Sequence, residues 1–294
     1  MIKKYTVWLW LVGVLIMLLT TGGCISVSQV EHLSAAGATY GASMDTLLYV
    51  AEENAVNADS ERLLSQGRGI STDDRKKIYA DHEGIYAVIE TLEHLRQHAR
   101  LLQRYFNALN VLATADAPAR AQNAVEGAAA ALNEVGQQLY KSPLLEPAQQ
   151  DALGQLAGLV TKTVQRHYIA KELKARADII EQQLRIQKEV TRAVAKKLTA
   201  DLQSIATLGI QREVMSPYVK GKITNESKWI QQRKTYVLAK AGVDALSSAE
   251  QAAAKLQQAW VAVIKREFDE LAFHDLLKDI ETLVSLAETA KAIQ

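Results

Sequence analysis

The chain has 294 residues, with 34 lysines and arginines against 33 aspartates and glutamates, and a formal net charge of +1. This balance excludes the strongly basic composition by which nucleic-acid-binding proteins are recognised. A single cysteine excludes an internal disulfide framework and a cysteine-rich metal site, so the fold must be stabilised by buried apolar surface.

The N-terminus has the layout of an export signal. Lys3 and Lys4 are followed by the 17 uncharged residues 5–21 and then by Gly22 and Gly23. Paired glycines break a helix and leave an extended backbone that a processing enzyme can bind. The uncharged run is at the lower end of the length that spans about 30 Å of hydrocarbon, so a retained membrane helix is the alternative.

The only cysteine comes directly after this segment, in the run Leu18-Leu19-Thr20-Thr21-Gly22-Gly23-Cys24. The run resembles the lipobox of bacterial lipoproteins, with Thr21 where that family usually carries leucine. The resemblance implies removal of residues 1–23 as a signal peptide and acylation of Cys24, and two or more acyl chains anchor a protein stably. Because Ile25 rather than aspartate follows the cysteine, it also implies an outer-membrane location facing the periplasm. An ordinary signal peptide with an incidental cysteine is the alternative.

The mature part, residues 24–294, begins with two long apolar stripes. From Val30 to Ala58 apolar positions recur every three or four residues and predict a helix that ends near Gly67. Residues 73–113 form the clearest element, a helix of about 60 Å. Its heptad repeat predicts packing against a partner along the whole length. The inward positions are Ile78, Ile85, Val88, Leu92, Leu95, Ala99, Leu102, Phe106 and Leu109.

Two further helices follow. Asp116 is expected to cap the third, with Pro118 in its first turn, and the alanine- and glycine-rich residues 124–139 should pack closely against a neighbour. After a break at residues 141–150, a long fourth helix runs without proline to Pro217. Three polar residues interrupt its apolar stripe: Gln187, Thr191 and Asp201.

Residues 215–227 are the most loop-like stretch of the mature chain, and Asn225 is the expected cap of the next helix. Helical character continues from there to the C-terminus, with an interruption near Gly242 and a capping-box pattern at Ser247 and Glu250. No stretch alternates apolar and polar residues for long enough to predict a sheet.

These elements predict an all-α fold. We expect a single domain over residues 24–294, an elongated bundle of about five to six long helices with coiled-coil-like heptad packing. The seam can be completed within one chain or between copies, which leaves self-association open.

Glu90, His94 and His98 recur at four-residue intervals on the second helix, a spacing that can bind a transition metal. The heptad register, with Leu92 and Leu95 inward, points Glu90 and His94 outward and leaves His98 beside the seam. The sequence contains no Glu-x-x-His element, phosphate loop or nucleophile elbow. We therefore expect no metal, no cofactor and no enzymatic activity.

Charge is unevenly distributed along the chain. Residues 162–240 carry 17 basic and 7 acidic side chains, whereas the rest of the mature chain carries 15 and 26. Basic and acidic helices can therefore lie side by side and pair. Alternatively, the basic strip faces anionic lipid headgroups or an acidic partner. The residues expected at such a contact are Lys228, Trp229, Arg233 and Lys234.

Together these features predict a lipid-anchored protein of the cell envelope that acts as a non-enzymatic binding or scaffolding module in the periplasm. The membrane is contacted through the lipid, the expected partner is a protein, and no nucleic acid is expected. Two alternatives remain open: a membrane-active protein whose C-terminal helices rearrange into lipid, and a metal-dependent helical-bundle enzyme.

Overall fold

The computed structural model describes residues 27–65, 72–114, 118–140, 168–239 and 243–292. No strand occurs among these residues, and the predicted all-α fold is confirmed. Six helices in the described ranges have 23 residues or more, and α8 adds a shorter seventh to the five or six expected. The elements are α2 (Val27–Ser65), α3 (Thr72–Thr114), α4 (Pro118–Tyr140), α6 (Tyr168–Gly209), the π-helical turn η1 (Ile210–Met215), α7 (Ser216–Val219), α8 (Glu226–Ala239), α9 (Val243–Lys265) and α10 (Glu270–Ala292).

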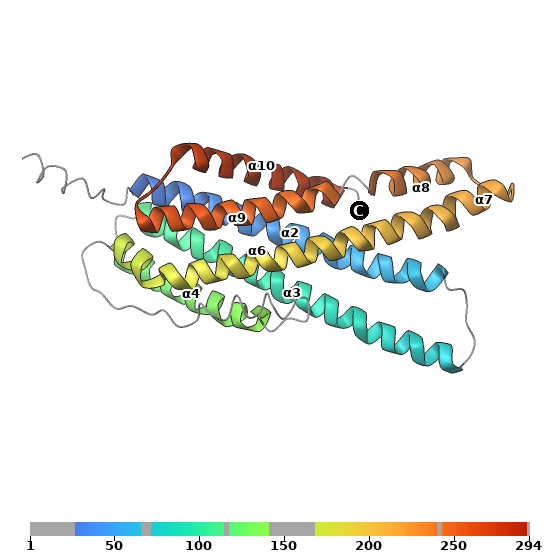
Figure 1. Cartoon of the computed structure of the whole chain (residues 1–294), viewed down its shortest axis with the longest axis horizontal. Coiled ribbons are helices and arrows are strands. Elements are labelled where there is room, and N and C mark those ends of the chain that lie inside the picture. The colour runs from blue at the N-terminus through green and yellow to red at the C-terminus, as the bar shows by residue number, and fades with distance from the viewer. Residues whose placement is uncertain (1–26, 66–71, 115–117, 141–167, 240–242, 293–294) are drawn as a thin grey trace, which may run out of the picture.

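The helices lie along one long axis (Figure 1). α2 and α6 run in the same direction and α3 runs in the opposite one. α4 packs against α3 and α6, α9 packs against α6, and α10 packs against α2 and α9. α2 begins at one end of this rod, whereas α7 lies at the other end.

The predicted heptad repeat of α3 forms the centre of the core. Its inward residues from Leu92 to Leu109 are buried, whereas Ile85 and Val88, nearer the helix start, are half-buried. The side chain of Ile78 lies outside the described residues. Burying one large aliphatic side chain contributes about 1.5–3 kcal/mol, so this seam is a main source of stability. It packs against a stripe on α2 of the same chain that consists of Val30, Leu33, Tyr40, Met44, Leu47, Leu48 and Ala51.

Three aromatic rings join α3 to α9. The ring centroids of Tyr105, Phe106 and Trp260 lie 5.5 to 6.1 Å apart in edge-to-face geometry. The indole N–H of Trp260 donates to the carbonyl oxygen of Ala177 on α6 at 3.2 Å. Edge-to-face pairs add to the area that the rings bury, so this cluster fastens the C-terminal hairpin to the central helices.

His98 lies inside the core, with no exposed surface. Its Nδ1 is 2.8 Å from the terminal amide of Gln187, and its Nε2 is 3.0 Å from Oε1 of Gln183. The prediction that His98 only flanks the seam is therefore wrong. α3 contacts α2, α4 and α6 at once, so its buried arc is wider than that of a helix with one partner. Glu90 is exposed and His94 half-buried, so the three residues do not converge.

The polar interruptions of α6 are the partners of this histidine. A neutral imidazole has one donor and one acceptor nitrogen, so His98 donates to Gln183 and accepts from the Gln187 amide when that amide presents its nitrogen. This orientation leaves the Gln187 oxygen for the buried hydroxyl of Tyr40, which lies beside Gln187 and Thr191. Burying polar groups is tolerated when they bond to one another, as His98, Gln183 and Gln187 do.

A close helix approach completes the cluster. The amide of Gln183 donates to Oδ1 of Asn133 on α4 at 3.2 Å. A Cβ atom at Gly136 would clash with Oε1 of Gln183, so a side chain at this position of α4 would push that oxygen away from His98. The predicted close packing of the third helix is confirmed here, and that helix begins at Pro118 as expected. Its expected cap, Asp116, lies outside the described residues.

One capping prediction is wrong. α9 begins at Val243, so Ser247 lies within the helix and not at its N-cap. The interruption expected near Gly242 falls between the described ends of α8 and α9.

We predict that His98 makes stability depend on pH. Burial lowers the pKa of His98 below its usual value, so the unfolded chain takes up a proton near pH 6.5 that the folded chain resists. This group therefore leaves the free energy of unfolding unchanged above about pH 7 and lowers it as the pH falls below about 6.5, by at most about 1.4 kcal/mol per pH unit. Denaturant titrations of the wild-type chain between about pH 5 and 7.5 measure the slope.

The variant His98→Gln keeps a donor and an acceptor but cannot titrate, so this part of the slope should disappear. His94→Gln, which replaces a half-buried histidine one turn away on the same helix, is the control and should keep it. Equal slopes for the wild type and His98→Gln would contradict the assignment.

Candidate functional site at the α7–α8 tip

The end of the rod opposite the start of α2 is a helical hairpin. α6 continues through η1 into α7, and the N–H of Ser216 bonds to the carbonyl of Gln211, five residues earlier. Pro217 follows directly. Its ring crowds the carbonyl four residues before it and it has no N–H, which explains why the helix widens into a π turn here. The prediction of a loop over residues 215–227 is thus wrong for residues 215–219 and 226–227, which are helical.

The turn between the two helices is short, and its first residues are hydrogen-bonded back to α7. Lys222 N–H donates to Pro217 O at 2.9 Å and Gly221 N–H donates to Tyr218 O at 3.1 Å, with Gly221 at a φ of +59°. This left-handed cap suits glycine. Oδ1 of Asn225 then accepts the N–H of Lys228 at 2.9 Å, which confirms the predicted cap of α8.

Trp229 fastens α8 to the end of α6. Its ring stacks on Tyr218, with centroids 5.9 Å apart and planes at 22°. Its indole N–H donates to the carbonyl oxygen of Val214 in η1 at 3.1 Å. Trp229 is half-buried, whereas 64% of Tyr218 is exposed, so Tyr218 is the ring that faces outward.

Residues 215–234 form this end of the rod and are called the tip. The outer surface of the tip combines apolar and cationic side chains. Of the eleven large hydrophobic residues that are exposed in the described part of the chain, four lie in this segment: Met215, Tyr218, Val219 and Ile230. The same segment carries five exposed cations, and none forms an ion pair with another described residue: Lys220, Lys222, Lys228, Arg233 and Lys234. Glu226 is the only acid between residues 215 and 234. The tip therefore has a net charge of +4.

A polar network holds the tip to the rest of the bundle. Arg212 in η1 bonds to both carboxylate oxygens of Glu61 on α2, at 2.7 and 3.2 Å, and also pairs with Glu213. The amide of Gln232 on α8 donates to Glu213 at 2.5 Å, and the hydroxyl of Tyr236 lies 3.5 Å from Glu61. Bonding to Glu61 raises the pKa of Arg212, and burial raises the pKa of Tyr236. The charge of Arg212 is balanced by the carboxylates of Glu61 and Glu213, whereas the cations of the tip have no such partner among the described residues.

Part of the basic segment does pair with acidic helices. Arg192 on α6 bonds to Glu250 on α9 at 2.7 Å, and Arg212 bonds to Glu61 on α2 at 2.7 Å. Helix-to-helix pairing, one of the two predicted uses of the basic charge, therefore occurs along the rod. The tip cations remain exposed.

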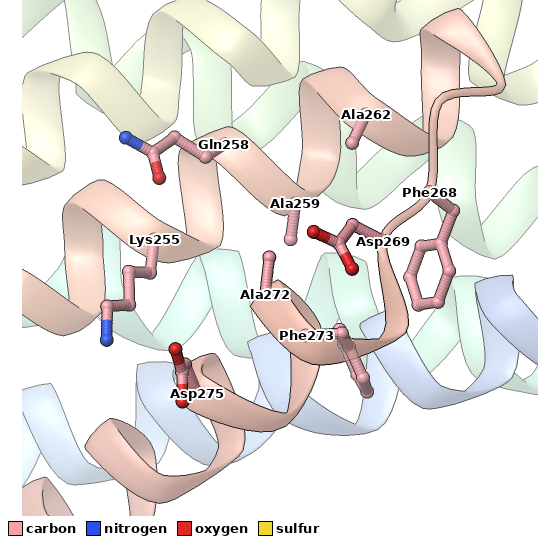
Figure 2. A pocket seen from close by; sticks show the side chains of 9 residues that line it. All are labelled: Lys255, Gln258, Ala259, Ala262, Phe268, Asp269, Ala272, Phe273 and Asp275. Carbon is pink, nitrogen blue, oxygen red and sulfur yellow. The ribbon is translucent and has the colours of Figure 1, made fainter.

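A hollow also lies between α9 and α10. It holds about 280 Å³, and Figure 2 shows Ala259 and Ala272 facing each other across it, with Phe268 and Phe273 at one end. Two of its charged groups, Asp269 and Lys255, already have structural roles. Oδ1 of Asp269 accepts the N–H of Leu271 at 2.9 Å as the cap of α10, and Lys255 on the other side pairs with Asp279 at 2.8 Å. The hollow is thus a gap in helix packing with an apolar lining.

The sequence predicted three of the cations and Trp229 but missed Tyr218 and Val219. The signal was present, because both residues follow Pro217 directly and lie beside Lys220 and Lys222. Cys24, the predicted lipidation site, lies outside the described residues. In the described ranges no three histidine, cysteine or acidic side chains gather at one point, and no helix there is long and apolar enough to cross a membrane.

A comparison with protein-family profiles, a search of curated proteins and a search of solved structures each found no match. The function of the tip therefore has to be inferred from its own chemistry.

We predict that Gly209 is required for the docking of α8. A Cβ atom at this position would clash with the ring of Tyr236, so the ring, and α8 with it, would be pushed away from α6. Overpacking of this kind costs about 1–3 kcal/mol. In Gly209→Ala, hydrogen exchange of the amides of residues 226–239 should be faster, while that of α3 is unchanged.

Gly127→Ala is the matched control, because nothing lies within 4 Å of the added carbon in α4. This variant should leave exchange in α8 as in the wild type. The same rates in α8 for Gly209→Ala and Gly127→Ala would show that the contact does not hold the tip.

Proposed function

We propose that this chain is a lipid-anchored, non-enzymatic protein of the bacterial cell envelope that holds a binding tip at a distance from its own membrane. The observation that carries the proposal is the placement of two features at opposite ends of the rod. α2 starts at one end and α7 lies at the other (Figure 1). Cys24 precedes the start of α2 by three residues, which reach at most about 10 Å.

The length of the rod determines how far the tip lies from the anchor. The helical run from Tyr168 to Val219 has 52 residues and, at 1.5 Å per residue, extends for about 75 Å. A run of this length, buried along one side by α2, α4 and α9, is a stiff spacer rather than a flexible leash. An acyl group on Cys24 would place the tip far from the anchoring bilayer.

The side chains of the tip suit binding rather than catalysis. They are cations and apolar groups on a convex surface, and Trp229 uses its hydrogen-bond donor inside the protein. The near-neutral charge of the whole chain argues against nucleic acid as the ligand. The resemblance of residues 18–24 to a lipobox, with Ile25 after the cysteine, supports an outer-membrane location facing the periplasm.

We predict that Cys24 carries fatty acid in cells. Metabolic labelling with an alkyne analogue of palmitate should label the wild-type chain, and mass spectrometry of its N-terminal peptide should begin at an acylated Cys24. Cys24→Ser should lose the label and keep residues 1–23. Thr21→Leu restores the residue usual in the family and should be labelled at least as strongly as the wild type.

Fractionation alone does not decide this question, because residues 1–23 could hold an uncleaved chain in a bilayer. The mass of the N-terminal peptide does decide whether Cys24 is acylated. A wild-type chain that begins before Cys24, with an unmodified thiol, would overturn the anchor.

A further inference from the structure

The outermost side chains of the tip are an aromatic and an aliphatic residue next to each other. Tyr218 and Val219 are the last residues of α7 and are exposed by 64% and 75%. A tyrosine with an apolar ring and a polar hydroxyl is the kind of residue that gathers at membrane–water interfaces. Grouped apolar exposure at one place on a soluble surface marks a contact site.

Cations flank this pair on two elements. Lys220 and Lys222 follow it in the turn, and Lys228, Arg233 and Lys234 lie on α8. Each lysine or arginine close to an anionic membrane strengthens binding by about five-fold. Lipid molecules move freely within a bilayer, so each exposed cation on its long side chain can pair with the phosphate of a different lipid headgroup.

The shape of the tip favours a bilayer over a protein as the ligand. A specific protein interface needs about 800 Å² of complementary surface on each partner. The tip is instead the narrow end of one hairpin, whose inner face is already used by Trp229 and Tyr236 for contacts within the chain. A headgroup layer adapts to such a convex end, and it provides negative charge and an apolar layer below it.

We propose that the tip binds an anionic lipid bilayer, with Tyr218 and Val219 inserted between headgroups and the five cations on their phosphates. Binding itself requires only the tip. Together with the proposed anchor at Cys24, on which this second part rests, the chain then bridges two bilayers. Cys24 precedes α2 by three residues, and the start of α2 and α7 lie at opposite ends of the rod (Figure 1).

The experiment uses the full lipidated chain, purified in detergent and reconstituted into vesicles of phosphatidylcholine. Fluorescent vesicles that contain phosphatidylglycerol are added, and clustering is followed by light scattering and co-sedimentation. Clustering should occur with phosphatidylglycerol vesicles, not with pure phosphatidylcholine vesicles, and should weaken as salt is raised. The triple variant Lys228→Gln, Arg233→Gln, Lys234→Gln should bind about 100-fold more weakly, and Val219→Ser about tenfold more weakly.

Matched controls separate the tip from general effects. Lys171→Gln, Lys174→Gln, Lys278→Gln removes the same charge from exposed positions on α6 and α10, and Leu271→Ser removes an equally exposed aliphatic side chain at the start of α10. Both control variants should bind as the wild type does. Circular dichroism and thermal unfolding establish that all variants are folded.

Equal binding to both kinds of vesicle, or an unchanged affinity of the tip triple variant, would overturn the proposal. So would a photo-crosslinker at Val219 that captures an acidic protein in cells while the vesicle assays are negative. If Cys24 proves to be unmodified, the bridging part fails, and the tip is tested by co-sedimentation of the unanchored chain with phosphatidylglycerol vesicles. The two proposals can therefore fail separately.

Discussion

The structure depends on how α3 is surrounded. α3 contacts α2, α4 and α6, and its buried leucines supply most of the seam that keeps these helices parallel to one axis. The wide buried arc of α3 includes a titratable side chain, His98. Gln183 and Gln187 of α6 meet both of its ring nitrogens. Because amide pairs of this geometry fit only one register, the cluster sets how α6 lies along α3, and with it how far the rod extends beyond the seam.

The two halves of the rod are held by different forces. Around Leu95 to Leu109 and Trp260 the contacts are apolar and buried, whereas Ile85 and Val88 are half-buried. At the tip, attachment relies on Glu61, Arg212 and the packing of Tyr236 over Gly209. Partly exposed ion pairs each contribute at most about 1 kcal/mol, so this end is the less stable one. Regions of low local stability commonly bind ligands, and the exposed cations lie there.

The sequence was informative where one local rule decides the outcome. The heptad of residues 73–113, the cap at Asn225 and the start at Pro118 each follow from neighbouring residues. The sequence-based prediction was wrong where several helices pack together. The burial of His98 requires three helices around α3, which no periodicity reveals. Residues 215–219 looked like a loop because of Pro217, yet a single π turn accommodates the proline. The stack of Tyr218 on Trp229 depends on the turn between them, so the sequence places both rings beside the cations but does not reveal which ring faces outward.

One stiff helical run separates the two ends of the rod, and a distance measurement between spin labels tests this most directly. Lys171→Cys near the start of α6 and Lys220→Cys after α7 are both exposed positions, and Cys24→Ser leaves these as the only thiols. At 1.5 Å per residue the labels should be about 70 Å apart. We expect one narrow distribution at that distance. A broad distribution, or one centred well below it, would show that the run bends or breaks at η1 and would contradict the account.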